Sequence, residues 1–232
     1  MSRTQQSLSD LPLFKDAEAD VLRRFEHQMF WKTADEGELV LDFEDESSDV
    51  FFIAQGAVRV VVRTPGGREI IFGDLHDGEF FGEMAAIDDQ PRSANVTALY
   101  KTRIGTMRAQ AFLNLVFSSR TISHRLMRIL TERIRGGNAR MLELAVLPIK
   151  LRLYRDLLRQ GRPRGTSGDL VISPPPFQHE IAARIGARRE AVSRELSQLA
   201  KDGAIEKTRR SIVIKAPDEL ENAIRLFLES DD

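Results

Sequence analysis

The stretch with the most suggestive chemistry is residues 80–94, which read Phe-Phe-Gly-Glu-Met-Ala-Ala-Ile-Asp-Asp-Gln-Pro-Arg-Ser-Ala. Gly82 and Glu83 are expected to open a short helical turn, and exposed backbone N–H groups at such a turn can hold an anion. Arg92 offers a guanidinium for the same negative charge, and the Glu83 carboxylate can accept hydroxyl protons. This combination suits a phosphate attached to a ribose. The structural alternative is a turn closed by an ion pair between Glu83 and Arg92.

A second group of polar residues lies near two short helical patterns, 178–185 and 188–202, which are joined across a glycine. A helix, a turn containing glycine and a second helix form a helix-turn-helix signature. Arginines at a helix N-terminus oppose the helix dipole, so Arg188 and Arg189 are not explained by helix stability. They are explained if this turn faces DNA, where arginine reads guanine and Glu190 accepts from cytosine.

A β-hairpin is expected after Gly203, with a basic turn from Lys207 to Arg210. Such a hairpin could act as a wing, because basic side chains in it would contact backbone phosphates. The alternative is an ordinary helical hairpin with surface arginines.

The charge of the chain is unevenly distributed, although its total is only −1. Residues 1–149 carry 18 Lys/Arg and 22 Asp/Glu, which is −4, and residues 150–215 carry 15 and 7, which is +8. Residues 216–232 carry 1 and 6, which is −5. A basic block between acidic segments is typical of a separate polyanion-binding module.

Composition excludes several classes of protein. The chain has 232 residues and no cysteine, which excludes disulfides, thiolate metal sites, cysteine-ligated iron–sulfur clusters and a cysteine nucleophile. The polar N-terminus lacks the features of a signal peptide, and no apolar run approaches the roughly 20 residues that span a bilayer. We therefore expect a cytoplasmic protein that does not contact a membrane.

The secondary structure expected in the N-terminal part of the chain changes from a helix to short strands. A short helix is expected over 11–26. Short segments rich in Val, Ile and Phe then recur between glycine-containing breaks, at 50–53, 58–63, 69–72, 80–81 and 94–99. Strands at this spacing predict an antiparallel barrel or sandwich.

A long helix is predicted over 121–147, with apolar residues at three- and four-residue steps that suit either a coiled-coil seam or packing on the barrel. The pair Gly136-Gly137 predicts a break or a close approach of another group. Pro148 ends or bends the helix. We therefore place domain limits at 1–117, 118–147 and 148–232.

Along nearly its whole length, the chain resembles the CRP/FNR family of bacterial transcription regulators, above all in the F-G-E-M-A…P-R-S-A pattern of the branch that binds cAMP. The resemblance implies an α+β fold with three parts: an N-terminal antiparallel β-barrel (a double-stranded β-helix that binds cyclic nucleotides), a long dimerisation helix and a C-terminal winged helix-turn-helix. It implies a homodimer held by residues 118–147, with double-stranded DNA, a cyclic nucleotide and RNA polymerase as partners. No enzymatic activity and no metal are expected.

The resemblance also assigns residues to the nucleotide site. Gly82 and Ser93 would bond the cyclic phosphate, Arg92 would pair with its charge, and Glu83 would bind the ribose 2′-hydroxyl. The remaining positions of the site lie beside the phosphate turn (Met84, Ala94), line the base (Phe72, Leu75, Val96) or approach it from the long helix (Arg133, Gly137, Asn138).

Gly137 and Asn138 stand where the best-known cAMP receptor has Thr-Ser, which is a departure from the pattern. Asn138 has both a donor and an acceptor, so it can serve the N6 amine of adenine or the O6 edge of guanine. The ligand expected is therefore cAMP, with cGMP as an alternative.

The resemblance also assigns the DNA contacts. Arg189, Glu190 and Arg194 match the three base-reading positions and imply half-sites like TGTGA, although the hinge at Leu147-Pro148 differs from the family's usual aspartate. The remaining DNA-contact positions are Gln178, Arg188, Ser193, Lys207 and Arg209.

Three alternatives remain open at this point. The first is a regulator of the same fold that works without a ligand or senses another small molecule, with haem ligation by His76 as the least favoured case. The second is a cupin-like metal oxygenase, which would need clustered histidine and carboxylate ligands. The third is a purely structural turn at residues 80–94.

Overall fold

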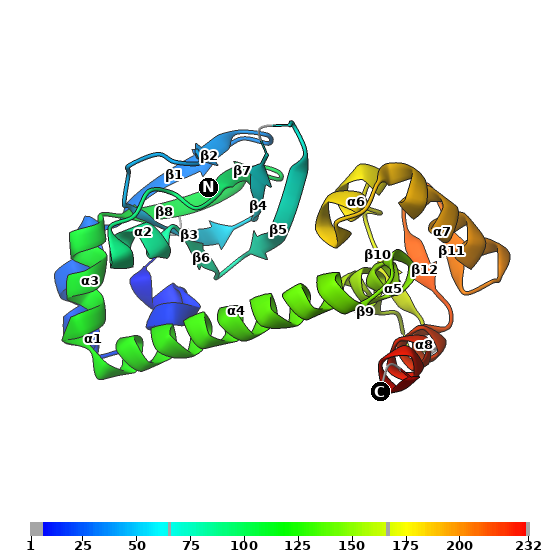
Figure 1. Cartoon of the computed structure of the whole chain (residues 1–232). Helices are drawn as coiled ribbons and strands as arrows, with labels where there is room; N and C mark the ends of the chain where they lie inside the picture. Colours follow the sequence, from blue (N-terminus) through cyan, green and yellow to red (C-terminus); the bar gives the residue numbers. More distant parts are fainter. Residues whose placement is uncertain (1–6, 65, 166–167, 231–232) are drawn as a thin grey trace. The chain divides into compact units, whose positions relative to one another are not determined.

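The computed structural model describes residues 7–64, 66–165 and 168–230, and the chain divides into two compact units. The first unit is Met1–Arg135 and the second is Gly136–Asp232. Figure 1 shows the elements of each unit in chain order. Within the described ranges, no helix is both long enough and apolar enough to cross a membrane.

The first unit contains two four-stranded antiparallel sheets, as the sequence predicted. One sheet has the order β1-β8-β3-β6, with β1 at Phe30–Ala34, β8 at Thr102–Met107, β3 at Val50–Gln55 and β6 at Phe80–Phe81. The other has the order β2-β7-β4-β5, with β2 at Leu39–Leu41, β7 at Asn95–Ala98, β4 at Ala57–Arg63 and β5 at Glu69–His76.

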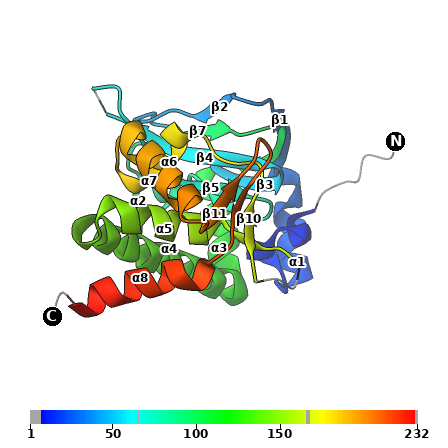
Figure 2. The same ribbon diagram turned by 90° about the vertical axis from the view of Figure 1, so that its right-hand side faces the viewer.

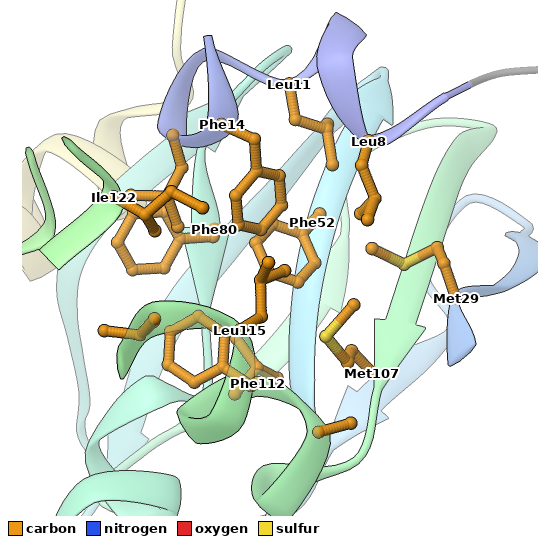
Figure 3. Packing of buried hydrophobic residues seen from close by; sticks show 14 of the residues in the cluster. Leu8, Leu11, Phe14, Met29, Phe52, Phe80, Met107, Phe112, Leu115 and Ile122 are labelled. Atoms are coloured by element: carbon orange, nitrogen blue, oxygen red, sulfur yellow. The ribbon is translucent and has the colours of Figure 1, made fainter. Parts of the chain in front are cut away.

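The helices of the first unit cover one end of this β-structure. They are α1 (Ala19–Phe25), α2 (Glu83–Asp88), α3 (Ala109–Ser118) and the N-terminal part of the long α4 (Arg120–Val146), with short 3₁₀ turns at Leu8–Asp10, Pro12–Phe14 and Glu26–Gln28. Phe14, Phe52, Phe80 and Phe112 pack together in the core where these helices meet the sheet (Figure 3). The core therefore anchors β6, the strand that begins the segment of residues 80–94, which is called the cassette below.

The helix predicted over 11–26 is wrong in its first half. Pro12 begins a separate 3₁₀ turn, and Asp16 has a positive φ of 60°, which no helix contains. Only Ala19–Phe25 forms an α-helix. Strands β1 and β8 were not predicted, and they pair with each other from Phe30 opposite Thr106 to Ala34 opposite Thr102.

The long helix α4 runs without interruption through Gly136 and Gly137, so no break occurs there. A Cβ atom on either glycine would meet nothing within 4 Å, and no described group approaches them. The two compact units nevertheless separate between Arg135 and Gly136, so that the C-terminal turns of α4 belong to the second unit. Glu143 in these turns pairs with Arg159 of the following helix at 2.8 Å. The limits 1–117, 118–147 and 148–232 stay a prediction.

The second unit consists of four further helices and a small antiparallel sheet of order β11-β12-β10-β9. The helices are α5 (Ile149–Gln160), α6 (Gln178–Ile185), α7 (Arg189–Lys201) and α8 (Pro217–Ser230). The strands are β9 (Arg162–Pro163), β10 (Leu170–Ile172), β11 (Ile205–Lys207) and β12 (Ile212–Ile214). Figure 2 shows α7, α8 and the β11 hairpin in a view turned by 90°.

A single core holds the second unit together. Leu157 of α5, Ile181 of α6 and Val192 of α7 are fully buried in it, and β12 contributes Ile214. The acidic helix α8 packs on this core through Leu220. The helix-turn-helix and the hairpin are thereby fixed relative to one another within the unit.

Candidate functional site

The turn between β6 and α2 requires a glycine at position 82. Gly82 has a φ of +80°, a conformation that favours glycine, and it forms the N-cap of α2. A Cβ there would lie 2.8 Å from Nη1 of Arg92 and 2.9 Å from the carbonyl oxygen of Asp49. The close approach of Arg92 therefore depends on the missing side chain.

Arg92 is buried and holds three segments of the chain together. Its Nη1 donates to the carbonyl of Gly82 at 2.8 Å, and its Nη2 donates to the carbonyl of Asp49 at 2.8 Å. Its Nε donates to Oγ of Ser47 at 3.0 Å. A guanidinium has five N–H donors, so these contacts fix the group while leaving capacity for an anion.

The electrostatic surroundings of Arg92 act in two directions. Burial lowers the pKa of the Arg92 guanidinium, whereas the negative charges of Asp49, Asp45 and Glu83 raise it. The ring of Phe51 lies beneath the guanidinium, with its centroid 5.7 Å from Cζ. The Arg92 guanidinium is therefore a fixed positive charge, and the carboxylates that act on it belong to the same chain.

Glu83 is buried and pairs with Arg133 of α4, not with Arg92 as the structural alternative supposed. Nη1 of Arg133 lies 2.7 Å from Oε1 of Glu83, and Nη2 donates to the carbonyl of Phe80 at 2.6 Å. The guanidinium also lies over the ring of Phe80, 4.6 Å from its centroid. The first residue of α2 and Phe80 at the start of β6 are thus tied directly to α4.

The other cassette residues lie close to this pair. Ser93 is exposed, and its hydroxyl lies 3.7 Å from the sulfur of Met84, which is also exposed. Ala94 is buried at the entry to β7. The structure thus brings Gly82, Met84, Arg92 and Ser93 together around one turn.

The residues assigned to the base belong to the β2-β7-β4-β5 sheet. Leu75 and Val96 pack in the same hydrophobic cluster between the sheets. Phe72 lies where the pairing register between β4 and β5 shifts, because Val61 faces Ile71 and Val60 faces Gly73. A bulge of this kind redirects a side chain, and Phe72 is half exposed.

Gly137 and Asn138 lie on α4 in the second unit, and both are exposed. Their contribution to a nucleotide site stays a prediction.

The helix-turn-helix has the geometry that the sequence predicted. Gly186 ends α6 with a φ of +66°, and Arg188 is the N-cap of α7. Val192 faces the core, whereas Arg189 and Arg194 are exposed. Glu190 is exposed on the first turn of α7 as well.

The remaining DNA-contact candidates flank this helix. Gln178 is the first residue of α6, and Ser193 is half-buried on α7. Lys207 ends β11, and Arg209 lies in the following turn, which Thr208 closes by donating its N–H to the carbonyl of Ser211 at 2.9 Å. Both basic residues are exposed.

Sequence reasoning missed the residues that hold Arg92. Ser47 and Asp49 are more than 40 positions away in the chain, and one of the two contacts uses a backbone carbonyl. No residue type or spacing could have indicated them.

The metal alternatives receive no support from the described part of the chain. In these ranges, no group of three or more His, Cys, Asp or Glu residues is arranged to hold a metal ion. His76 is the exposed last residue of β5.

Two family models match the chain. Residues 31–119 match the cyclic nucleotide-binding domain, and residues 151–223 match the Crp-like helix-turn-helix domain. The matches cover the two regions that carry the candidate sites.

Known proteins of similar sequence and structure agree with these matches. The cyclic AMP receptor protein of Thermus thermophilus is 32% identical over 170 residues, which are 69% of this chain and 72% of that protein. A CRP-like cAMP-activated global transcriptional regulator of Mycobacterium tuberculosis is 29% identical over 185 residues, 78% of this chain and 83% of that protein. The fold matches a CooA mutant from Carboxydothermus hydrogenoformans with a TM-score of 0.76 at 18% identity, over 95% of this chain and 98% of that one.

The chain therefore belongs to the CRP/FNR family of DNA-binding transcription regulators, which are not enzymes. It combines a cyclic nucleotide-binding domain with a Crp-like helix-turn-helix domain.

Proposed function

We propose that this protein is a homodimeric transcription regulator that binds a cyclic nucleotide in its first unit and thereby binds palindromic DNA. The observation that carries the proposal is the contact of Arg133 with Glu83 at 2.7 Å. It joins the cassette, where the nucleotide would bind, to the helix that continues into the DNA-binding unit. A ligand at Glu83 and Arg92 would therefore act directly on α4.

The site residues divide the recognition of the nucleotide between them. Arg92 and the turn at Gly82 would hold the cyclic phosphate, with Ser93 adding a hydroxyl, because charge-assisted hydrogen bonds are the strong ones. Glu83 would accept from the ribose 2′-hydroxyl. Leu75 and Val96 would border the base with Phe72.

The preferred ligand in this proposal is cAMP, with cGMP as the alternative. The Thermus and Mycobacterium relatives both have cAMP in their names. Asn138 of one or both protomers would meet the base edge, where its amide can donate or accept.

The homodimer would form along α4. Met127, Ile134 and Met141 are each more than half exposed, and they recur at seven-residue steps, the spacing of a coiled-coil seam. A nucleotide that contacts the cassette and this helix would favour one arrangement of the two helices, which is a population shift.

The DNA site would be a palindrome resembling TGTGA in each half. Arg189, Glu190 and Arg194 are exposed on the first turns of α7, where a recognition helix meets base edges. Lys207 and Arg209 would contact phosphates. Two such helices in a dimer read half-sites about 10–10.5 bp apart, and RNA polymerase is the expected further partner.

Calorimetric titration of the full chain with cAMP and with cGMP tests the ligand directly. We expect saturable binding of cAMP and weaker binding of cGMP. If neither nucleotide binds at millimolar concentration, the nucleotide-dependent proposal fails.

One observation favours the alternative of a regulator that works without a cyclic nucleotide. Three N–H groups of Arg92 already donate to Ser47, Gly82 and Asp49, so the turn is stable without an anion. In that case DNA affinity would be the same with and without either nucleotide.

Replacing Arg189 with alanine should weaken binding to the specific palindrome by about 1–3 kcal/mol, the value of one bidentate base contact. Non-specific DNA binding should change much less. The control is Arg225→Ala on α8, which removes an exposed arginine of the same unit that donates to Asn222 on its own helix. Equal affinity of the Arg189 variant and the wild type for the palindrome would contradict the assignment of α7.

A further inference from the structure

Ser47 lies outside the cassette, in the acidic segment between β2 and β3, and its hydroxyl contacts Arg92. Residues 42–49 contain five carboxylate side chains and two hydroxyls, those of Ser47 and Ser48. Oγ of Ser47 accepts a hydrogen bond from Nε of Arg92 at 3.0 Å. Among the described residues, Ser47 is the only side chain that accepts from this guanidinium, because its other two acceptors are backbone carbonyls.

The segment around Ser47 holds the backbone of Arg92 as well as its side chain. The N–H of Arg92 donates to the carbonyl of Asp45 at 2.9 Å, and the N–H of Glu44 donates to the carbonyl of Arg92 at 3.0 Å. The N–H of Ser47 donates to Oδ1 of Asp45 at 2.8 Å, which is the bond of an Asx turn. These backbone bonds set the position of the Ser47 hydroxyl relative to the arginine.

The hydroxyl of Ser47 occupies one edge of the Arg92 guanidinium. Nε of an arginine carries one N–H, and each Nη carries two. Ser47 takes the single N–H of Nε, whereas Nη1 and Nη2 each use one N–H for a backbone carbonyl. One N–H on each Nη is therefore left for an anion, and the edge that includes Nε is closed.

We propose that Ser47 is a positioning residue of the nucleotide site, which orients Arg92 so that its Nη groups, and not Nε, meet the cyclic phosphate. This inference rests on the proposed binding of a cyclic nucleotide at the cassette. The ring of Phe51, with its centroid 5.7 Å from Cζ of Arg92, supports the same orientation. Without the hydroxyl, the guanidinium is less ordered before binding, and its Nε competes with the Nη groups for the phosphate.

The orientation of Arg92 has a consequence for the stereochemistry of the ligand. The cyclic phosphate has two exocyclic oxygens, and a guanidinium that is held in one orientation reaches them unequally, because hydrogen bonds depend on direction. Replacing one or the other oxygen with sulfur gives two phosphorothioate diastereomers of cAMP. A protein with an oriented arginine should bind these diastereomers with different affinities.

Calorimetric titration of the full chain with cAMP tests the role of Ser47 in affinity. Ser47→Ala should weaken binding by about 3- to 10-fold, the usual cost of ordering one long side chain on binding. Ser47→Thr keeps a hydroxyl and should bind within about twofold of the wild type, since the hydrogen bond to Arg92 is retained. The matched control is Ser48→Ala, which removes the neighbouring half-buried hydroxyl and should leave the affinity unchanged.

Titration with the two phosphorothioate diastereomers separates positioning from a purely structural role. The wild type should discriminate between them, and Ser47→Ala should reduce the ratio of their affinities by about two- to tenfold, the value of one hydrogen bond. Ser47→Cys keeps the size of the side chain but offers only a weak acceptor, so it should lose discrimination in the same way. Thermal unfolding monitored by circular dichroism establishes that each variant is folded.

The outcomes distinguish this inference from the proposed function. If the wild type binds cAMP and Ser47→Ala binds it equally well, the assignment of Ser47 is wrong and the proposed function stands. The same holds if the Ala variant binds both diastereomers more weakly by one factor, or if a folded Thr variant is as weak as the Ala variant. A wild type that binds neither cAMP nor its phosphorothioates overturns both.

Discussion

Replacing Arg92 with alanine is expected to weaken cyclic-nucleotide binding by about 10- to 150-fold. The variant loses a charge-assisted contact to the cyclic phosphate, and hydrogen bonds to charged groups contribute about 1.5–3 kcal/mol each. The variant should also be less stable by about 1–3 kcal/mol, because the carbonyls of Gly82 and Asp49 lose their donor. Calorimetry with cAMP and thermal unfolding measure the two effects separately.

Two further variants keep this prediction testable if the alanine variant unfolds. Ser93 is exposed and its hydroxyl makes a weak contact with the sulfur of Met84, so Ser93→Ala should weaken nucleotide binding without loss of stability. Arg63→Ala removes an exposed arginine of β4 in the same unit and should change neither property. A folded Arg92 variant that binds cAMP as tightly as the wild type would contradict the cassette assignment.

Replacing Ile134 with glutamate is expected to convert the dimer into monomers and to remove specific DNA binding. Ile134 is 64% exposed in the single chain, so the substitution should change the stability of the monomer by no more than about 0.5 kcal/mol. In a dimer, the two glutamates would be buried face to face without partners, which costs about 3–5 kcal/mol and weakens association more than 100-fold.

Sedimentation equilibrium measures the association, and Arg135→Glu provides the matched control. Arg135 is the next residue on α4 but lies outside the seven-residue spacing of Met127, Ile134 and Met141. Its variant should remain dimeric. A monomeric wild type, or a dimeric Ile134 variant, would contradict the proposed seam.

Local patterns predicted the elements that carry the candidate sites. The helix-turn-helix was recognisable from two helical patterns joined across Gly186, and in the structure this glycine has the left-handed conformation that the turn needs. The barrel was recognisable because apolar segments and glycines alternate at regular spacing. The strand order β1-β8-β3-β6 could not be predicted from the sequence, because pairing between residues 30 and 106 leaves no local signal.

The sequence predicted the residues of the nucleotide site, but not the contacts that hold them in place. Arg92 and Glu83 were found from their neighbours in the chain, but their partners come from other elements. Arg92 is held by the segment that contains Ser47 and Asp49, and Glu83 is held by Arg133, 50 positions later. Of the two interpretations of Gly136-Gly137, a break or a close approach of another group, the break is wrong, because α4 continues through both glycines despite a cost of about 1 kcal/mol for each.

The second unit contains the basic block that the charge distribution of the sequence showed. Its basic residues include both exposed arginines on α7 and arginines buried in ion pairs. Arg189 and Arg194 are exposed, whereas the Arg184 side chain is buried and pairs with Asp156. Net charge alone could not separate a DNA-binding surface from a buried cluster.

Fluorescence anisotropy on a labelled TGTGA palindrome shows whether a cyclic nucleotide controls the DNA affinity of this protein. The affinity of the full chain is measured without ligand, with cAMP and with cGMP at one salt concentration, because DNA affinity depends strongly on salt. We predict that cAMP raises the affinity by about 5- to 150-fold, the usual range of allosteric coupling, and that cGMP raises it less. Equal affinities under all three conditions would contradict the account.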